Sequence, residues 1–171
     1  MGNRKSREHQ KQARDRAMWD QARTASRDFV EDVLVPGIGV RRLQVVLVPS
    51  FEQGFAWDVR VLGVTWRLFR SEISNEDYSG PKLSGYEELD ASGDMLREYF
   101  DKLRTLTLPI GPLLNDMGGL DGTDYHLALF GDLQSEVRLR WWTESPPQWS
   151  PLVAIADDMI ETFLRLRPKD D

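Results

Sequence analysis

Five short stretches of the chain have the composition of β-strands, and most of them alternate apolar and polar residues. The alternation is clearest in 55–61, where Phe55, Trp57 and Val59 share one predicted face. The stretch 42–48 is apolar at most positions on both faces, which is typical of an inner strand. Leu62-Gly63 is either a tight turn or a bulge in one long strand, and the turn is preferred because two strands of about six residues are commoner than one of twelve or more. The five predicted strands are Arg42–Val48, Phe55–Val61, Val64–Arg70, Tyr125–Phe130 and Glu136–Trp142.

Three other stretches carry apolar residues three and four positions apart, the spacing of one face of an α-helix. The first predicted helix spans Gln12–Val35. The second begins after Ser92 and the third after Ser150, because serine caps helix N-termini, and Pro151 suits a first helical position. The predicted buried stripes are Met18, Ala22, Ala25, Phe29 and Val33; then Met95, Leu96, Tyr99, Phe100, Leu103 and Leu106; then Leu152, Ile155, Met159, Phe163 and Leu166.

The last two predicted strands should form a β-hairpin. Residues that face each other across a hairpin lie on the same side of the sheet. Pairing 129 with 137, 127 with 139 and 125 with 141 keeps the apolar residues together, Trp141 among them. The same register places His126 opposite Arg140 and Ala128 opposite Arg138 on the outer face.

The predicted order of elements is α-βββ-α-ββ-α. Strands joined by short connections pair antiparallel, and amphipathic helices cover one face of such a sheet. We therefore expect an α+β fold, with an antiparallel sheet of about five strands and helices packed on one face. Residues 13–171 are expected to form a single domain, and residues 1–12 a disordered basic tail.

The distribution of charge narrows the choice of partners. Residues 1–27 hold eight Lys or Arg against three Asp or Glu, whereas the rest of the chain holds fourteen against twenty-five. An acidic body disfavours binding to nucleic acid.

The chain has no cysteine, which excludes disulfides and thiolate chemistry. No stretch is apolar enough to span a membrane and no secretory signal is present, so a cytoplasmic location is expected.

Enzymatic chemistry finds little support in the sequence. His126 is the one histidine outside the predicted tail, and an isolated histidine on an outer strand face is usually just exposed. Asp116, Asp121 and Asp124 surround a glycine-rich turn, but they lack the spacing of a calcium loop. We therefore assign no catalytic residue, no metal ligand and no cofactor. A hydrolase that uses these three carboxylates is the least favoured hypothesis.

A binding site finds more support. Tryptophan and arginine are enriched where proteins contact one another, and paired guanidiniums bind carboxylates or phosphates. The candidate binding residues are His126, Arg138, Arg140, Trp142 and Trp149. The alternative is that arginine stacks on tryptophan and simply covers the edge of the sheet.

Two further segments are candidates for function. Glu72–Asp90 is acidic, rich in turn-forming residues and without a period, so it is predicted to be a long loop that contacts a partner or merely connects two elements. The loop Pro109–Thr123 is the predicted cover of a small-ligand pocket between sheet and helices, the alternative to protein binding.

The C-terminal part also shows a resemblance. Asp121-Gly122-Thr123 and Tyr125, then Arg140-Trp141-Trp142, then Pro147, Trp149 and Pro151-Leu152 are similar to a pattern found in small uncharacterised bacterial proteins. The pattern covers about a fifth of the chain and implies a bacterial origin. The acidic, cysteine-free composition also resembles immunity or accessory proteins encoded beside bacterial toxins. The sequence thus predicts a non-enzymatic binding protein with a protein partner, whose identity and oligomeric state it does not specify.

Overall fold

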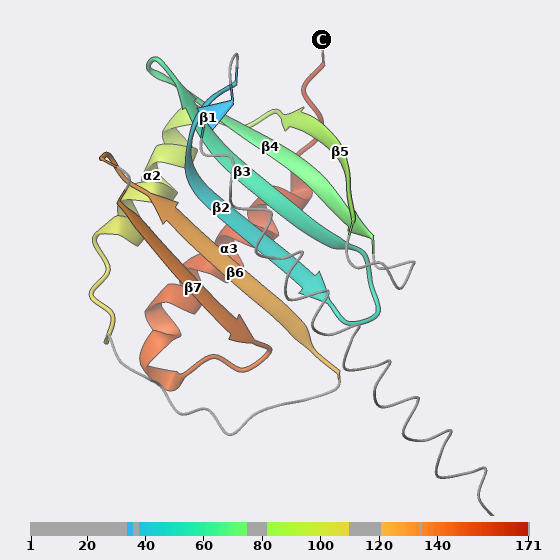
Figure 1. The fold of residues 1–171 in the computed structure, drawn as a ribbon, viewed down its shortest axis with the longest axis vertical. Coiled ribbons are helices and arrows are strands. Elements are labelled where there is room, and N and C mark those ends of the chain that lie inside the picture. Colours follow the sequence, from blue (N-terminus) through green and yellow to red (C-terminus); the bar gives the residue numbers. More distant parts are fainter. Residues whose placement is uncertain (1–33, 36–37, 75–81, 110–120, 134, 171) are drawn as a thin grey trace, which may run out of the picture.

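The computed structural model describes residues 34–35, 38–74, 82–109, 121–133 and 135–170. Seven described strands form one antiparallel sheet, and the two described α-helices lie on one of its faces, behind the sheet in Figure 1. The predicted α+β class is confirmed. The elements are β1 (Leu34–Val35), β2 (Gly39–Pro49), β3 (Gly54–Leu62), β4 (Thr65–Ser74), β5 (Lys82–Leu89), α2 (Gly93–Arg104), β6 (Thr123–Phe130), β7 (Glu136–Trp142), the 3₁₀ turn η1 (Pro147–Trp149) and α3 (Ser150–Arg165).

The strands lie in the order β5-β4-β3-β2-β6-β7, and β1 adds a short pair beside the start of β2. The predicted turn between β3 and β4 is confirmed, since Leu62 pairs directly with Thr65. Gly63 takes a φ of +63° there, a conformation that glycine adopts without strain. β2 pairs with β6 along the middle of the sheet, so the hairpin β6–β7 extends the sheet that β2–β5 begin.

The predicted loop at Glu72–Asp90 is wrong over much of its length. β4 continues to Ser74, and Lys82–Leu89 forms the edge strand β5. The pairing of β4 with β5 shifts register between Arg70 and Glu72, and Gly85 has a φ of +66°. A bulge of this kind breaks the two-residue alternation, which is why the pattern of the sequence did not reveal the strand. Residues 75–81 lie outside the described part of the chain.

The end of the first predicted helix is also corrected. Leu34 and Val35 pair with Val40 and Gly39 as strand β1. Gly39 has a φ of +96°, and a Cβ at this position would collide with the carbonyl of Val61. The chain therefore reverses beside β3, and an extended segment replaces the helix end there. The tail at 1–12 and the rest of this helix prediction, with its stripe from Met18 to Val33, lie outside the described residues.

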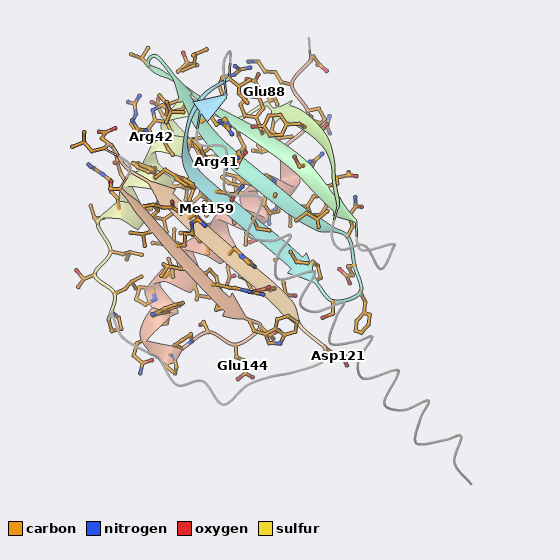
Figure 2. All side chains as sticks on the ribbon, in the orientation of Figure 1. Arg41, Arg42, Glu88, Asp121, Glu144 and Met159 are labelled. Carbon is orange, nitrogen blue, oxygen red and sulfur yellow. The ribbon has the colours of Figure 1, made fainter. Side chains whose placement is uncertain are left out.

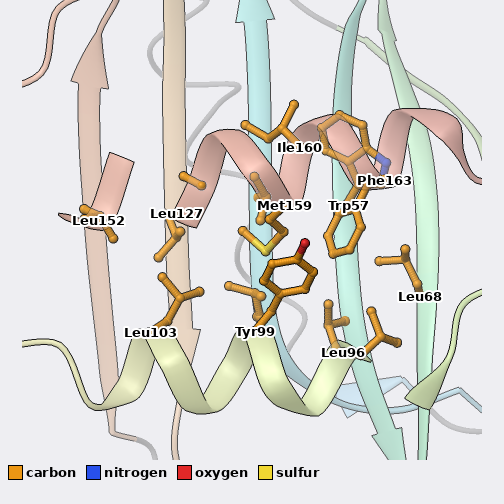
Figure 3. Packing of buried hydrophobic residues seen from close by; sticks show 14 of the residues in the cluster. Trp57, Leu68, Leu96, Tyr99, Leu103, Leu127, Leu152, Met159, Ile160 and Phe163 are labelled. Carbon is orange, nitrogen blue, oxygen red and sulfur yellow. The ribbon is translucent and has the colours of Figure 1, made fainter. Parts of the chain in front are cut away.

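The other two predicted helices are confirmed with small shifts. α2 starts one residue after Ser92, although the Ser92 side chain accepts no capping hydrogen bond, and it ends at Arg104. α3 begins at Ser150 itself, with Pro151 in its first turn. Figure 3 shows the two helices facing the sheet across one apolar core. Its members include Trp57, Leu68, Leu96, Tyr99, Leu103, Leu127, Leu152, Met159, Ile160 and Phe163.

The opposite face of the sheet carries a second buried region. Val46, Ala56 and Ile73 form a small apolar cluster there. Beside it, polar side chains of β2 and β3 are almost completely buried, including Arg60, which is 1% exposed. We call this side the helix-free face, because both described helices lie on the other side (Figure 1). No described helix is long and apolar enough to span a membrane.

Candidate functional site

The hairpin β6–β7 has the register that the sequence predicts. Leu129 pairs with Val137, Leu127 with Leu139 and Tyr125 with Trp141. On the helix-free face His126 therefore lies opposite Arg140, and Ala128 opposite Arg138. Four of the five candidate binding residues come together here. We call this surface the hairpin face; it consists of His126, Arg138, Arg140 and Trp142, together with Asp124 and Glu136.

Trp149 does not belong to the hairpin face. It lies in η1 and packs against Trp141 on the helix side of the sheet, with ring centroids 6.4 Å apart and the rings perpendicular. Trp141 also stacks parallel to Tyr125 at 5.3 Å, and it is 6% exposed. The three rings thus join the hairpin to the start of α3. Trp149 has a structural role that the sequence did not separate from a binding role.

The arginines of the hairpin face are already paired within the chain. Arg140 binds both carboxylate oxygens of Asp124 through its Nε and Nη2 atoms, with an Nε–Oδ1 distance of 2.8 Å. Arg138 forms an ion pair with Glu136 on its own strand. The two guanidiniums are thus balanced by two carboxylates, so the hairpin face is a mixed-charge surface rather than the cationic one the sequence suggested.

Asp124 is the residue of this cluster whose role the sequence did not identify. Its carboxylate is buried, and the Nε2 atom of His126 lies 3.1 Å from its Oδ2 atom, outside hydrogen-bond geometry. Burial opposes its ionisation, but His126 and Arg140 outweigh this effect and lower the pKa of Asp124. A carboxylate with a lowered pKa is a weak general base, which makes this cluster better suited to structure or binding than to proton transfer.

Trp142 is held by the glycine turn at the start of β6. A Cβ on Gly122 would lie 2.7 Å from the indole Nε1 of Trp142 and closer still to the Oγ1 of Thr143. Ser50 stabilises the same turn, because its amide and its hydroxyl both donate hydrogen bonds to the Gly122 carbonyl. Asp121-Gly122-Thr123 and Trp141-Trp142 are therefore parts of one packing unit.

The two edge strands of the sheet, β5 and β7, differ in whether further backbone lies beside them. Beside β5, the Lys169 amide donates to the Glu88 carbonyl at 2.9 Å, and Asp90 donates to Arg167 at the same distance. The C-terminal residues thus bond the outer edge of β5. The described residues include no further backbone beside β7, which is the last strand in the order. Its exposed side chains include Val137, which is 52% exposed.

Hydrogen bonding across the hairpin shows which groups of β7 point outward. Gly131 donates to Ser135 at one end of the hairpin and Thr143 donates to Thr123 at the other. Bonded and non-bonded pairs alternate in antiparallel strands. Residues 137, 139 and 141 therefore bond β6, whereas the N–H and C=O groups of Glu136, Arg138 and Arg140 point away from it. The exposed edge of β7 presents these groups for pairing.

A second polar cluster lies at the centre of the helix-free face, and the sequence did not predict it. The Asp58 carboxylate accepts from Arg41 at 2.8 Å and from Gln44 at 3.0 Å. Arg60 lies 3.5 Å from the same carboxylate and donates to the Tyr86 hydroxyl at 2.9 Å. Burial, followed by the charge of Asp58, raises the pKa of Tyr86 to about 12. Because Asp58 balances buried guanidiniums, we interpret this cluster as structural.

Two acidic residues of the expected 72–90 loop, Glu87 and Glu88, are also paired. Glu87 accepts from Arg70 at 2.9 Å across the β4–β5 pair. Glu88 accepts from Arg67 and from Lys169, and Figure 2 shows it beside the chain near the C-terminus. The hydrogen bond from Arg67 is the main reason why the pKa of Glu88 falls to about 2. These carboxylates stabilise the β5 edge, which weakens the earlier interpretation of the segment as a partner-binding loop.

The carboxylates proposed for a metal site do not converge. Asp124 is bound by Arg140, and Asp121 is exposed at the lower end of the hairpin in Figure 2. Asp116 lies outside the described residues. Within the described ranges, no group of three His, Asp or Glu side chains is arranged to hold a metal ion.

The structure also contains an open hollow of about 380 Å³ at the start of α2. It lies between the β3–β4 turn and the end of β5, away from the sheet–helix position predicted for a pocket under Pro109–Thr123. Trp66, Leu89 and Ala91 supply apolar walls, and Arg97 and Lys169 supply positive charge beside Asp90 and Asp94.

Comparison of the chain with protein-family models, with curated proteins and with solved structures gave no match.

Proposed function

We propose that this protein is a non-enzymatic binding protein that engages another protein through the outer edge of β7. The observation that carries the proposal is the difference between the two sheet edges. The C-terminal residues bond the outer edge of β5, whereas the described residues place nothing along β7. An extended segment of a partner can add to such an edge, gaining affinity from main-chain hydrogen bonds and specificity from side chains.

The side chains of β7 fit this mode of binding. Glu136, Arg138 and Arg140 project on the helix-free face, and the half-exposed Val137 projects on the helix face. Leu133, at the tip of the hairpin, is fully exposed with a φ of +56°. A non-glycine residue with positive φ is uncommon and strained, and such residues are frequent at functional sites. Charges on an edge strand also discourage unselective pairing, so they favour a partner of matching charge pattern.

The chemistry of the hairpin favours binding over catalysis. The His126–Asp124 contact is the closest approach to a catalytic pair on this face, but Arg140 occupies the carboxylate and lowers its pKa together with His126. A catalytic triad needs a nucleophile beside the histidine. On the hairpin face defined above, the neighbours of His126 are arginines, a tryptophan and carboxylates.

The test blocks the edge of β7 without disturbing the hairpin. Proline at 138 removes an N–H group that points away from β6, which an edge strand tolerates. Arg138→Thr is the matched control, because it removes the same charge but keeps the N–H and favours a strand. Tagged wild type and both variants are used to capture proteins from cells that produce the chain. A partner retained by Arg138→Thr and lost with Arg138→Pro supports strand addition. A partner retained equally by all three contradicts it.

A second candidate function rests on the hollow at the start of α2. A small molecule could bind there between Trp66 and the charged groups of Arg97 and Lys169. Trp66 is half-buried and contacts Phe100 of α2 at a centroid distance of 5.5 Å, so a ligand would alter its fluorescence. A metabolite screen by thermal shift tests this function, since a ligand of the native state raises the melting temperature. The shift should disappear in Lys169→Ala and Arg97→Ala.

A further inference from the structure

The edge of β7 has a charge pattern that complements itself. Glu136 and Arg138 lie two residues apart on the helix-free face, and Val137 lies between them on the helix face. In an antiparallel pair, the residues at equal distances on either side of the centre face each other. Two β7 strands can pair antiparallel with the two Val137 residues opposite each other, a register we call pairing around Val137. Each Glu136 then faces Arg138 of the other strand, and the two half-exposed valines are in contact.

We infer from this that the β7 edge binds a second copy of the same chain, so that the two sheets become continuous. The inference rests on the proposed function and names its partner. Opposite charges directly across two strands stabilise the pair, and like charges destabilise it. The residues that face each other share a face of the sheet, so both helix layers lie on the same side of the joined sheet.

The hydrogen-bond pattern of β7 limits the possible registers. Glu136, Arg138 and Arg140 point their backbone groups outward, so only registers that pair these residues with one another form a full ladder. Pairing around Arg138 places Glu136 opposite Arg140 twice, but it also brings the two Arg138 side chains face to face. Pairing around Leu139 places Arg138 opposite Arg140 twice. Pairing around Val137 is the register that places opposite charges at both Glu136–Arg138 contacts.

The same register covers exposed apolar surface. Val137 is 52% exposed in the single chain and would lie against its counterpart at the centre of the pair. Apolar side chains at the centre of an interface with charges around them are the usual arrangement of a protein–protein contact.

The experiment uses charge reversal and measures the mass in solution by sedimentation velocity over a range of concentrations. The wild type should shift from 19.7 kDa towards about twice that mass. Glu136→Arg and Arg138→Glu should each weaken association, on the order of tenfold or more, because each places like charges opposite one another. Both positions are on an exposed strand, and circular dichroism confirms that the variants fold.

Mixing the two variants gives the decisive result. One has two arginines at 136 and 138 and the other two glutamates, so an equimolar mixture should form a heterodimer, although each alone stays a monomer. The double exchange Glu136→Arg with Arg138→Glu should restore the homodimer. A wild type that stays monomeric, or a mixture that behaves like its components, overturns the inference. If a different protein is still lost only with Arg138→Pro, the proposed function stands without it.

Discussion

The replacement of Trp141 by alanine should be one of the most destabilising single changes in the chain. Trp141 is 6% exposed and lies between the parallel ring of Tyr125 at 5.3 Å and the perpendicular ring of Trp149 at 6.4 Å. Removal of a buried tryptophan costs about 3–5 kcal/mol. Each aromatic pair adds about 0.5–1.5 kcal/mol beyond the area it buries, so we expect a loss near the upper end of that range.

Urea denaturation followed by circular dichroism measures this loss as the difference in the free energy of unfolding. Leu133→Ala is the control on the same hairpin, because Leu133 is fully exposed and should change stability by less than about 0.5 kcal/mol. If Trp141→Ala does not fold at all, Trp141→Phe keeps an apolar ring in the site and should lose less. A loss below about 1 kcal/mol in Trp141→Ala would refute the packing and the register of the hairpin.

Three further changes test other parts of the structure. Asp58→Ala leaves buried guanidiniums without their carboxylate and should cost about 3–5 kcal/mol in urea denaturation; an unchanged midpoint would contradict the buried cluster. Gly122→Ala should cost about 1–3 kcal/mol by crowding Thr143, and a second change, Thr143→Ala, should recover part of it; an alanine as stable as the glycine would show that the turn has room. The lowered pKa of Glu88, about 2 against 4.5 for the free carboxyl, means that its stabilisation is complete above pH 4.5 and is lost as the pH falls towards 2. Glu88→Gln should flatten this part of the stability–pH curve, and an identical curve would show that the pair with Arg67 does not stabilise the fold.

Local periodicity was enough to identify most of the architecture. The strands β2, β3, β4, β6 and β7 and the helices α2 and α3 all follow predicted stretches, and the hairpin register follows from the requirement that Leu127 and Leu139 share a face. Such patterns succeed where one face of an element is buried against an apolar core, since a shift of one residue would expose every apolar side chain.

The pattern failed where local geometry departs from it. Strand β5 contains a bulge and a glycine with positive φ, and it lies in a stretch rich in charge. Its glutamates bind cross-strand partners such as Arg70. No spacing along the chain reveals such contacts. A charge that is paired across a sheet looks the same in the sequence as a charge free to bind a partner.

In the candidate site too, the sequence predicted which residues share a face but not which side chains contact one another. The sequence grouped His126, Arg138, Arg140 and Trp142 correctly on one face, because they belong to one hairpin of known register. It did not separate Trp149, whose position depends on η1, nor did it show that Asp124 and Glu136 neutralise the arginines. These contacts depend on side-chain directions across strands, which the residue pattern does not specify.

The central claim is that the edge of β7 is the binding edge of this protein. Amide hydrogen exchange measured residue by residue, at low and at high protein concentration, tests it most directly. At low concentration the amides of Arg138 and Arg140 should exchange quickly, whereas those of Val137 and Leu139, bonded to β6, should be protected. At high concentration, or with a captured partner, Arg138 and Arg140 should become protected and their neighbours should change little. Protection of all four amides in the dilute protein, or no change on association, would contradict the claim.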